Sequence, residues 1–190
     1  MKNTFLSTLV AASLLLVTGC SDHTSLDVPA TRPNKDPYPS TYIVPDNGAF
    51  AILNTNVLTG DGAELRNTDL LVREGKIIAL GTNLDLDASV SLIDAKGQWV
   101  TPGLIDVHSH MGVYSAPGTA NHSDGNEMTS PVTAQVWAEH SVWPGDPQFE
   151  KALAGGVTTV QILPGSGNLI GGRGVTLKNI PSITVQGMKF

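Results

Sequence analysis

The stretch Val100-Thr101-Pro102-Gly103-Leu104-Ile105-Asp106-Val107-His108-Ser109-His110 decides how this chain is interpreted. It is an apolar strand that ends in two histidines separated by one residue. Alternate side chains of an extended strand share a face, so His108 and His110 are expected to point the same way from its carboxyl end. Two imidazoles side by side on a rigid strand can form half of a metal site. The alternative is a pair of ordinary surface or hydrogen-bonded histidines.

Sequence blocks on both sides of this strand resemble a known family. The blocks are residues 56–62, 69–81, 93–97, 102–110, 154–160 and 163–168. In this order and at this spacing they resemble the amidohydrolase superfamily of metal-dependent hydrolases, and within it the imidazolonepropionase-like and secreted amidohydrolase branch. The similarity extends over about residues 50–190.

The resemblance implies an α/β fold in two parts. A small β-sandwich, residues 49–101, is expected to precede the N-terminal part of a (β/α)₈ TIM barrel, residues 102–190. Residues 104–110 and 157–163 are expected to be its first two strands, and 175–185 part of a third segment. Because such a barrel needs about 250 residues, the barrel is expected to be incomplete and the chain to be a fragment.

Local signals predict smaller elements within these parts. Residues 69–73 and 76–80 alternate as strands do and flank Glu74-Gly75, a turn in which glycine can take a positive φ. Asp146 as an N-cap and Pro147 at the first helical position predict a helix over residues 147–154. The long polar connection 111–143 is expected to wall a substrate pocket, with Trp137 and Trp143 packing it.

The resemblance also implies a metal site. His108 and His110 would be ligands to the more buried of one or two divalent ions, zinc being favoured. A bridging carboxylate, two more histidines and a catalytic aspartate would come from later strands, so no catalytic residue is assigned before Phe190. Asp106 is predicted to be a carboxylate that orients a ligand. The alternative is a buried aspartate that is hydrogen-bonded to backbone amides.

A glycine-rich loop, residues 164–174, follows the second predicted barrel strand. Its spacing fits neither a Walker A loop nor a dinucleotide-binding loop, which argues against nucleotide binding. At the mouth of a barrel, Ser166, Asn168 and Arg173 could hold polar groups of a substrate, Arg173 being suited to a carboxylate. A purely structural turn is the alternative.

The N-terminus predicts export and lipid attachment. Residues 1–19 have the length of a signal peptide and end in Val17-Thr18-Gly19-Cys20, which resembles a bacterial lipobox. Cys20 is the only cysteine and would carry the lipid. An ordinary signal peptide is the alternative. Residues 20–48 are then a proline-containing flexible linker, or else a loop packed on the domain. The implied location is the cell envelope, with an outer-membrane anchor facing the periplasm favoured.

Charge and composition limit the classes of molecule that the chain is expected to bind. The net charge is −6 without a basic cluster, which argues against nucleic acid. The expected partners are a small amide or cyclic amide substrate and, through the lipid anchor, the membrane; oligomerisation is left open. The predicted function is metal-dependent hydrolysis of carbon–nitrogen bonds. The alternatives are a catalytically inactive remnant and a ligand-binding lipoprotein.

Overall fold

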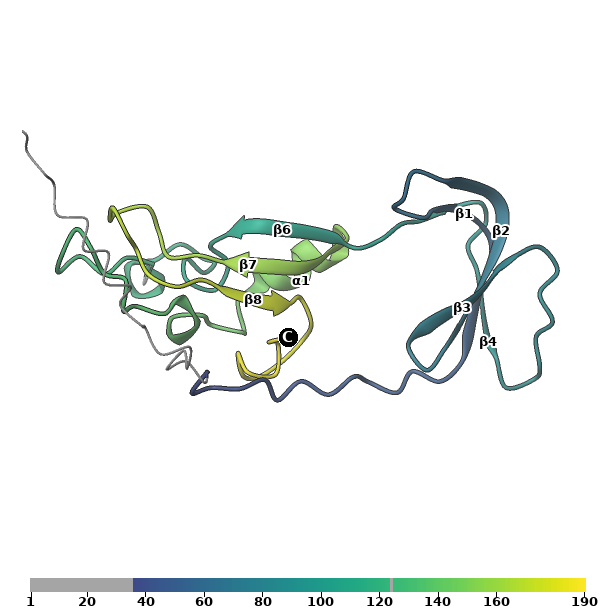
Figure 1. Cartoon of the computed structure of the whole chain (residues 1–190), viewed down its shortest axis with the longest axis horizontal. Helices are drawn as coiled ribbons and strands as arrows, with labels where there is room; N and C mark the ends of the chain where they lie inside the picture. Colours follow the sequence, from purple (N-terminus) through teal and green to yellow (C-terminus); the bar gives the residue numbers. More distant parts are fainter. Residues whose placement is uncertain (1–35, 124) are drawn as a thin grey trace, which may run out of the picture. The chain divides into compact units, whose positions relative to one another are not determined.

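The computed structural model describes residues 36–123 and 125–190, which form a mixed α/β fold (Figure 1). Its elements are β1 (Phe50–Leu58), β2 (Glu64–Arg73), β3 (Lys76–Gly81), β4 (Ser91–Asp94), β5 (Trp99–Val100), β6 (Leu104–Ser109), the 3₁₀ turns η1 (Ala120–His122) and η2 (Ala138–His140), α1 (Pro147–Ala154), β7 (Val157–Ile162) and β8 (Val175–Lys178). No helix in this part of the chain is long and apolar enough to cross a membrane. The predicted signal peptide and Cys20 lie outside the described residues.

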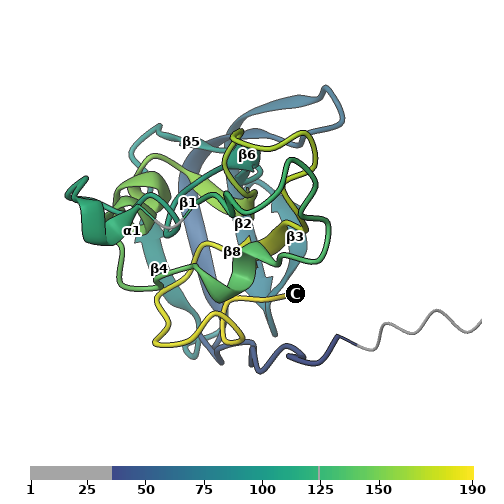
Figure 2. The same ribbon diagram turned by 90° about the vertical axis from the view of Figure 1, so that its left-hand side faces the viewer.

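The first sheet contains β1 to β5. Its order is β3-β2-β1-β4, with β5 also paired to β1 (Figure 2). The β1–β2 and β2–β3 pairs are antiparallel, whereas β4 and β5 run parallel to β1. A small core of Ala51, Leu71 and Val90 packs on it. The second layer of a β-sandwich is not seen among the described residues, and the sandwich stays a prediction.

The predicted hairpin between β2 and β3 is confirmed. Glu74 and Gly75 have φ values of 50° and 70°. Two consecutive positive φ values are what a two-residue hairpin turn of type I′ requires, because its twist matches that of the flanking strands. Glycine adopts this conformation without a Cβ penalty, so the turn follows from local sequence.

The second sheet has the order β6-β7-β8. Strands β6 and β7 are parallel, as expected of successive barrel strands. Strand β8 runs antiparallel to β7, so the expectation of a further barrel segment over residues 175–185 is wrong for β8. Parallel pairing needs a long crossover, usually a helix, and residues 163–174 contain none. The barrel, of which residues 102–190 would form the N-terminal part, stays a prediction.

Helix α1 and strand β7 contribute three residues to the core of this second part. The helix begins at Pro147 and ends at Ala154 as predicted, and the Asp146 carboxylate accepts a hydrogen bond from the Gln148 backbone N–H. Its buried Phe149 packs with Val160 and Ile162 of β7, both fully buried. Val160 and Ile162 are β-branched and alternate along the strand, so one face of β7 lies against this core.

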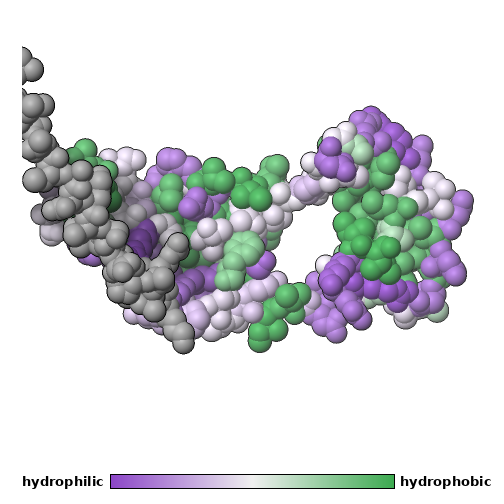
Figure 3. Space-filling model, viewed as in Figure 1, coloured by the Kyte–Doolittle hydropathy of each residue, from purple (hydrophilic) through white to green (hydrophobic). Residues whose placement is uncertain are grey.

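Strand β6 lies at the edge of this sheet and exposes apolar side chains. Leu104, Ile105 and Val107 are 58%, 67% and 66% exposed. Figure 3 shows this hydrophobic surface along β6. Only its last residue, Ser109, is buried within the strand.

Residues 36–41, here called the strap, contact the end of the chain. The Ser40 hydroxyl donates to the Lys189 carbonyl at 2.9 Å, and the Thr41 N–H donates to the Gln186 carbonyl at 3.0 Å. The Lys189 ammonium donates to the Asp36 carboxylate at 2.5 Å. Residues 36–41 of the predicted linker are thus packed on the folded part, which is the alternative given for residues 20–48. The domain boundaries stay predictions.

Candidate metal centre

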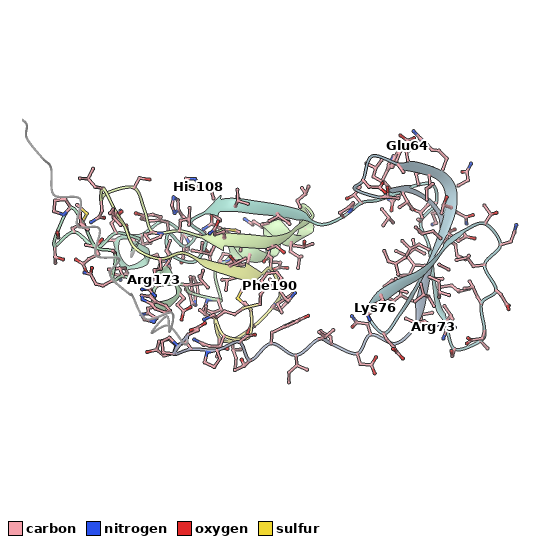
Figure 4. The ribbon with its side chains drawn as sticks, in the orientation of Figure 1. Glu64, Arg73, Lys76, His108, Arg173 and Phe190 are labelled. Atoms are coloured by element: carbon pink, nitrogen blue, oxygen red, sulfur yellow. The ribbon has the colours of Figure 1, made fainter. Side chains whose placement is uncertain are left out.

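The carboxyl end of β6 brings the two predicted metal ligands together. The ring centroids of His108 and His110 are 5.3 Å apart, with an interplanar angle of 89°. The pairing with β7 shifts register between Asp106 and Ser109, an interval that includes His108, so regular pairing is interrupted at the pair. The rings nevertheless meet edge to face, and Figure 4 shows His108 where β6 ends.

The His110 imidazole is held from two sides. Its Nδ1 lies 2.9 Å from the Leu163 carbonyl oxygen, which can only accept a hydrogen bond. In the neutral ring Nδ1 therefore carries the proton, which leaves Nε2 as the nitrogen with a lone pair. The ring also packs edge to face against Tyr114, with centroids 5.6 Å apart. A ligand histidine that donates its other ring nitrogen to a carbonyl is a common arrangement at metal sites.

His108 is more exposed, and Asp106 holds its backbone. The Asp106 carboxylate accepts a hydrogen bond from the His108 backbone N–H at 3.1 Å. Asp106 is half-buried rather than buried. Asp106 therefore contacts the backbone of His108 and not its ring. Any effect on His108 as a ligand would be transmitted through the strand backbone.

The long connection 111–143 is fastened to the glycine-rich loop beside His110. The Asn126 side-chain amide donates to the Tyr114 hydroxyl, and its oxygen accepts from the Gly167 N–H at 2.9 Å. The Gly165 N–H donates to the Gly125 carbonyl at 2.6 Å. This connection therefore does border the histidine pair, although whether it walls a substrate pocket stays a prediction.

The three predicted substrate-binding residues make different contacts. Ser166 and Asn168 line an open hollow of about 410 Å³. Asn168 also donates through Nδ2 to the backbone carbonyls of Glu127 and Ser130, which ties the two loops together. The Arg173 guanidinium stacks 4.6 Å from the Trp137 ring centroid. Their contact with a substrate stays a prediction.

The donor set fits a metal ion in part. Imidazole nitrogens suit zinc and other transition metals, and His110 presents a defined Nε2. Zinc takes four ligands, and the described residues contain no group of three or more His, Cys, Asp and Glu side chains that could hold a metal ion. His108 and His110 thus fit as two ligands of an ion whose other ligands lie elsewhere.

Sequence reasoning missed several residues around the site. Tyr114 follows His110 by one turn, and its N–H donates to the His110 carbonyl at 3.0 Å. That spacing places the two side chains on one side, which the sequence could have suggested. Asn126 and the Leu163 carbonyl gave no signal, because their contacts depend on how distant loops meet.

Comparison with known proteins supports the resemblance to the amidohydrolase superfamily. No family model matches the chain. It is 35% identical over 114 residues to the amidohydrolase tasK of Hapsidospora irregularis, a match that covers 58% of this chain and 12% of that protein. It is 32% identical over 142 residues to an imidazolonepropionase of Colwellia psychrerythraea, covering 60% of this chain and 34% of the relative.

A solved structure agrees with these relatives. An amidohydrolase from Thermotoga maritima has a TM-score of 0.68 and 38% sequence identity, over 74% of this chain and 36% of that one. The chain thus spans between 12% and 36% of the length of these proteins. These relatives are amidohydrolase-type hydrolases. Their names and the structural similarity together support membership of this chain in the amidohydrolase superfamily.

Proposed function

We propose that this chain belongs to a metal-dependent hydrolase of carbon–nitrogen bonds in which His108 and His110 supply two ligands to a divalent ion, most suitably zinc. The observation that carries the proposal is the edge-to-face histidine pair at the end of β6, with Nδ1 of His110 on the Leu163 carbonyl. Its support from known proteins is the similarity to the Thermotoga amidohydrolase. The imidazolonepropionase-like branch is our proposal for its place within the superfamily.

The described residues prepare the site for such an ion. When bound, a divalent metal lowers the pKa of a coordinated water and polarises a substrate carbonyl. The chain's own contribution is to present Nε2 of His110 in a fixed tautomer and His108 beside it. Ser166, Asn168 and Arg173 are our candidates for binding polar groups of an amide or cyclic amide substrate.

The test compares His108→Ala and His110→Ala with His122→Ala, each in the product of the full reading frame. His122 is a matched control, since its Nδ1 contacts the Pro117 carbonyl at 3.0 Å, within the long connection. Zinc content and hydrolysis of a hydantoin, an imidazolone and a dipeptide are measured with and without a chelator. We expect metal and activity to fall only in the first two variants.

Other outcomes separate the alternatives. Metal binding without hydrolysis of any substrate by the product of the full reading frame would indicate an inactive remnant. Quenching of tryptophan fluorescence by these compounds that survives chelation would indicate a ligand-binding lipoprotein. Equal zinc content in all three variants and the parent chain would contradict the proposed site.

We propose further that Cys20 anchors the protein to a bacterial membrane, with the folded part facing the periplasm. The support is the sequence Val17-Thr18-Gly19-Cys20 after an apolar leader. A thioether-linked diacylglycerol plus an acyl chain exceeds what stable anchoring needs. Replacing Cys20 by Ser should remove radiolabelled palmitate from the protein and shift it from the membrane fraction to the soluble fraction; retained label would contradict the anchor.

A further inference from the structure

A chain of contacts leads from the glycine-rich loop to the His110 ring. Gly167 donates its N–H to Asn126 at 2.9 Å, Asn126 donates to the Tyr114 hydroxyl, and the Tyr114 ring packs against His110. Asn126 is exposed, yet both ends of its amide are engaged. The predicted function does not explain why this side chain should bridge two loops at this point.

The glycine at position 165 has a specific reason to be there. A Cβ on Gly165 would lie 2.2 Å from the Tyr114 hydroxyl oxygen and within 2.8 Å of the Asn126 amide atoms. No side chain fits without expelling one of the two. The glycine-rich loop is thus shaped to seat Tyr114 and Asn126, which accounts for one of its glycines without a phosphate ligand.

The backbone around Tyr114 is also fixed. Its N–H donates to the His110 carbonyl, and the Asp146 carboxylate accepts from the N–H groups of Gly112 and Ala116 at 2.8 and 3.2 Å. Because the backbone on both sides is held, the Tyr114 ring has little freedom to move away from His110. Its hydroxyl then needs only one partner to fix the ring plane, and Asn126 is that partner.

We propose that Tyr114 and Asn126 are positioning residues of the histidine pair: the Tyr114 ring confines the His110 imidazole, and Asn126 holds Tyr114 through its hydroxyl. The inference rests on the proposed metal site. The Leu163 carbonyl selects the tautomer of His110, while Tyr114 limits rotation of its ring about the Cβ–Cγ bond. Nε2 is thereby directed to one place before any ion binds.

The effect should appear in metal affinity. Removing partners that orient a metal-ligating histidine typically weakens binding by about 10-fold or more. Tyr114→Leu, which deletes the ring, should weaken Co²⁺ binding most. Tyr114→Phe and Asn126→Ala break the same hydrogen bond, so each should weaken binding by a smaller and similar factor. The double variant, Tyr114→Phe with Asn126→Ala, should bind Co²⁺ no more weakly than the weaker of the two single variants. Both changes remove the same hydrogen bond, and the effects of residues in direct contact are not additive.

The experiment uses the product of the full reading frame, which includes any further metal ligands, and two readouts. Co²⁺ affinity is followed by visible absorption, and the tautomer of His110 by long-range ¹H–¹⁵N NMR without metal, at a pH well above the usual imidazole pKa. Tyr42→Phe and Asn121→Ala are matched controls, one a tyrosine that packs on Lys178 and the other an exposed asparagine of the same long connection. Both should behave like the parent chain.

The outcomes separate this inference from the proposed function. The parent chain should show a single Nδ1–H tautomer, and Tyr114→Leu should show a mixture; an unchanged spectrum in Tyr114→Leu overturns the inference. Tyr114→Phe, whose ring is retained, guards against a folding failure of the leucine variant. Absence of Co²⁺ binding by the parent product of the full reading frame would contradict the metal site, while the NMR comparison would still decide the positioning role. Additive losses in the double variant would contradict the shared hydrogen bond.

Discussion

At the scale of single residues, the start of β6 depends on a missing side chain. A Cβ on Gly103 would lie 2.1 Å from the Thr158 Oγ1 and 2.8 Å from the Thr158 Cβ. These atoms belong to the neighbouring strand β7, so the close approach of the strands excludes any larger residue. The requirement is one of space rather than of backbone conformation.

Gly103→Ala should therefore separate the ends of β6 and β7. Overpacking of this kind costs about 1–3 kcal/mol of the free energy of unfolding. Urea unfolding followed by circular dichroism measures it. Gly118→Ala is the matched control, because nothing lies within 4 Å of a Cβ there. Equal midpoints for the two variants would show that β7 yields without cost.

Asp146 fastens the start of the long connection to helix α1. It is 2% exposed, and its carboxylate accepts from the N–H groups of Gly112, Ala116 and Gln148. It thus joins the first turn of α1 to the backbone that follows the histidine pair. The sequence predicts only its N-cap role, because the other two donors are thirty or more residues away.

Asp146→Ala should cost about 2–3 kcal/mol of the free energy of unfolding, since a lost cap and buried unpaired N–H groups both contribute. Asp146→Asn keeps one oxygen acceptor and should lose less. Urea unfolding gives both values. A loss in Asp146→Ala of well under 1 kcal/mol, typical of a surface change, would show that water replaces the carboxylate.

At the scale of elements, the buried ammonium group of Lys189 joins the strap to the last residues of the chain, beside the hydrogen bonds of Ser40 and Thr41. Lys189 and Glu139 are 7% and 6% exposed, and their charged atoms are 2.8 Å apart. Burial alone would lower the pKa of Lys189, but its hydrogen bonds to Asp36 and Glu139 outweigh this and raise the pKa. The hydrogen bond from Lys189 also lowers the pKa of Asp36. Glu139 Oε1 has no hydrogen-bond partner in the described part of the chain and lies 4.0 Å from His140 Nε2.

The strap should therefore be docked in the middle of the pH range. The raised pKa of Lys189 gives stability that is full below its unfolded value of about 10.4 and is lost as pH rises through the folded value. The lowered pKa of Asp36 gives stability that is present above about 3.9 and is lost as pH falls through the folded value. Outside this window, hydrogen exchange at the Thr41 amide, which donates to Gln186, should rise relative to the intrinsic exchange rate at the same pH.

Lys189→Met tests the same contact by substitution. It leaves the Glu139 carboxylate buried without its cation, which should cost about 3 kcal/mol of the free energy of unfolding. Lys189→Met combined with Glu139→Leu should recover part of it, because no charge then stays buried. Thr41 exchange that is unchanged in the single variant would show that Ser40 and Thr41 alone hold the strap.

At the scale of the whole molecule, strand β6 is exposed. It pairs only with β7 within the described residues, and three of its apolar side chains are more than half exposed (Figure 3). An unpaired apolar edge strand is a template for association with another chain. We expect the isolated chain to self-associate through this edge.

Ile105→Lys should reduce that association, because a charged side chain on an edge strand opposes pairing. Light scattering over a range of concentrations measures it. Ile183→Lys is the matched control, since Ile183 is 97% exposed but lies outside the strands. An equal reduction by both changes would point to charge in general rather than to the β6 edge.

What the sequence by itself determined is local. The Glu74-Gly75 turn, helix α1 with Asp146 and Pro147, and the closeness of His108 and His110 follow from residues adjacent or nearly adjacent in the chain. Backbone sterics, helix capping and strand geometry act over a few residues, so these features are readable without a tertiary structure.

Only the tertiary structure decided the rest. The antiparallel direction of β8, the partners of Tyr114 and Asn126, and the burial of Lys189 against Glu139 and the strap join residues far apart in the sequence. Each depends on which segments meet when the core around Val160 and Ile162 forms. Local conformational preferences are weak, and tertiary packing overrides them. The contacts that position His110 follow from that packing.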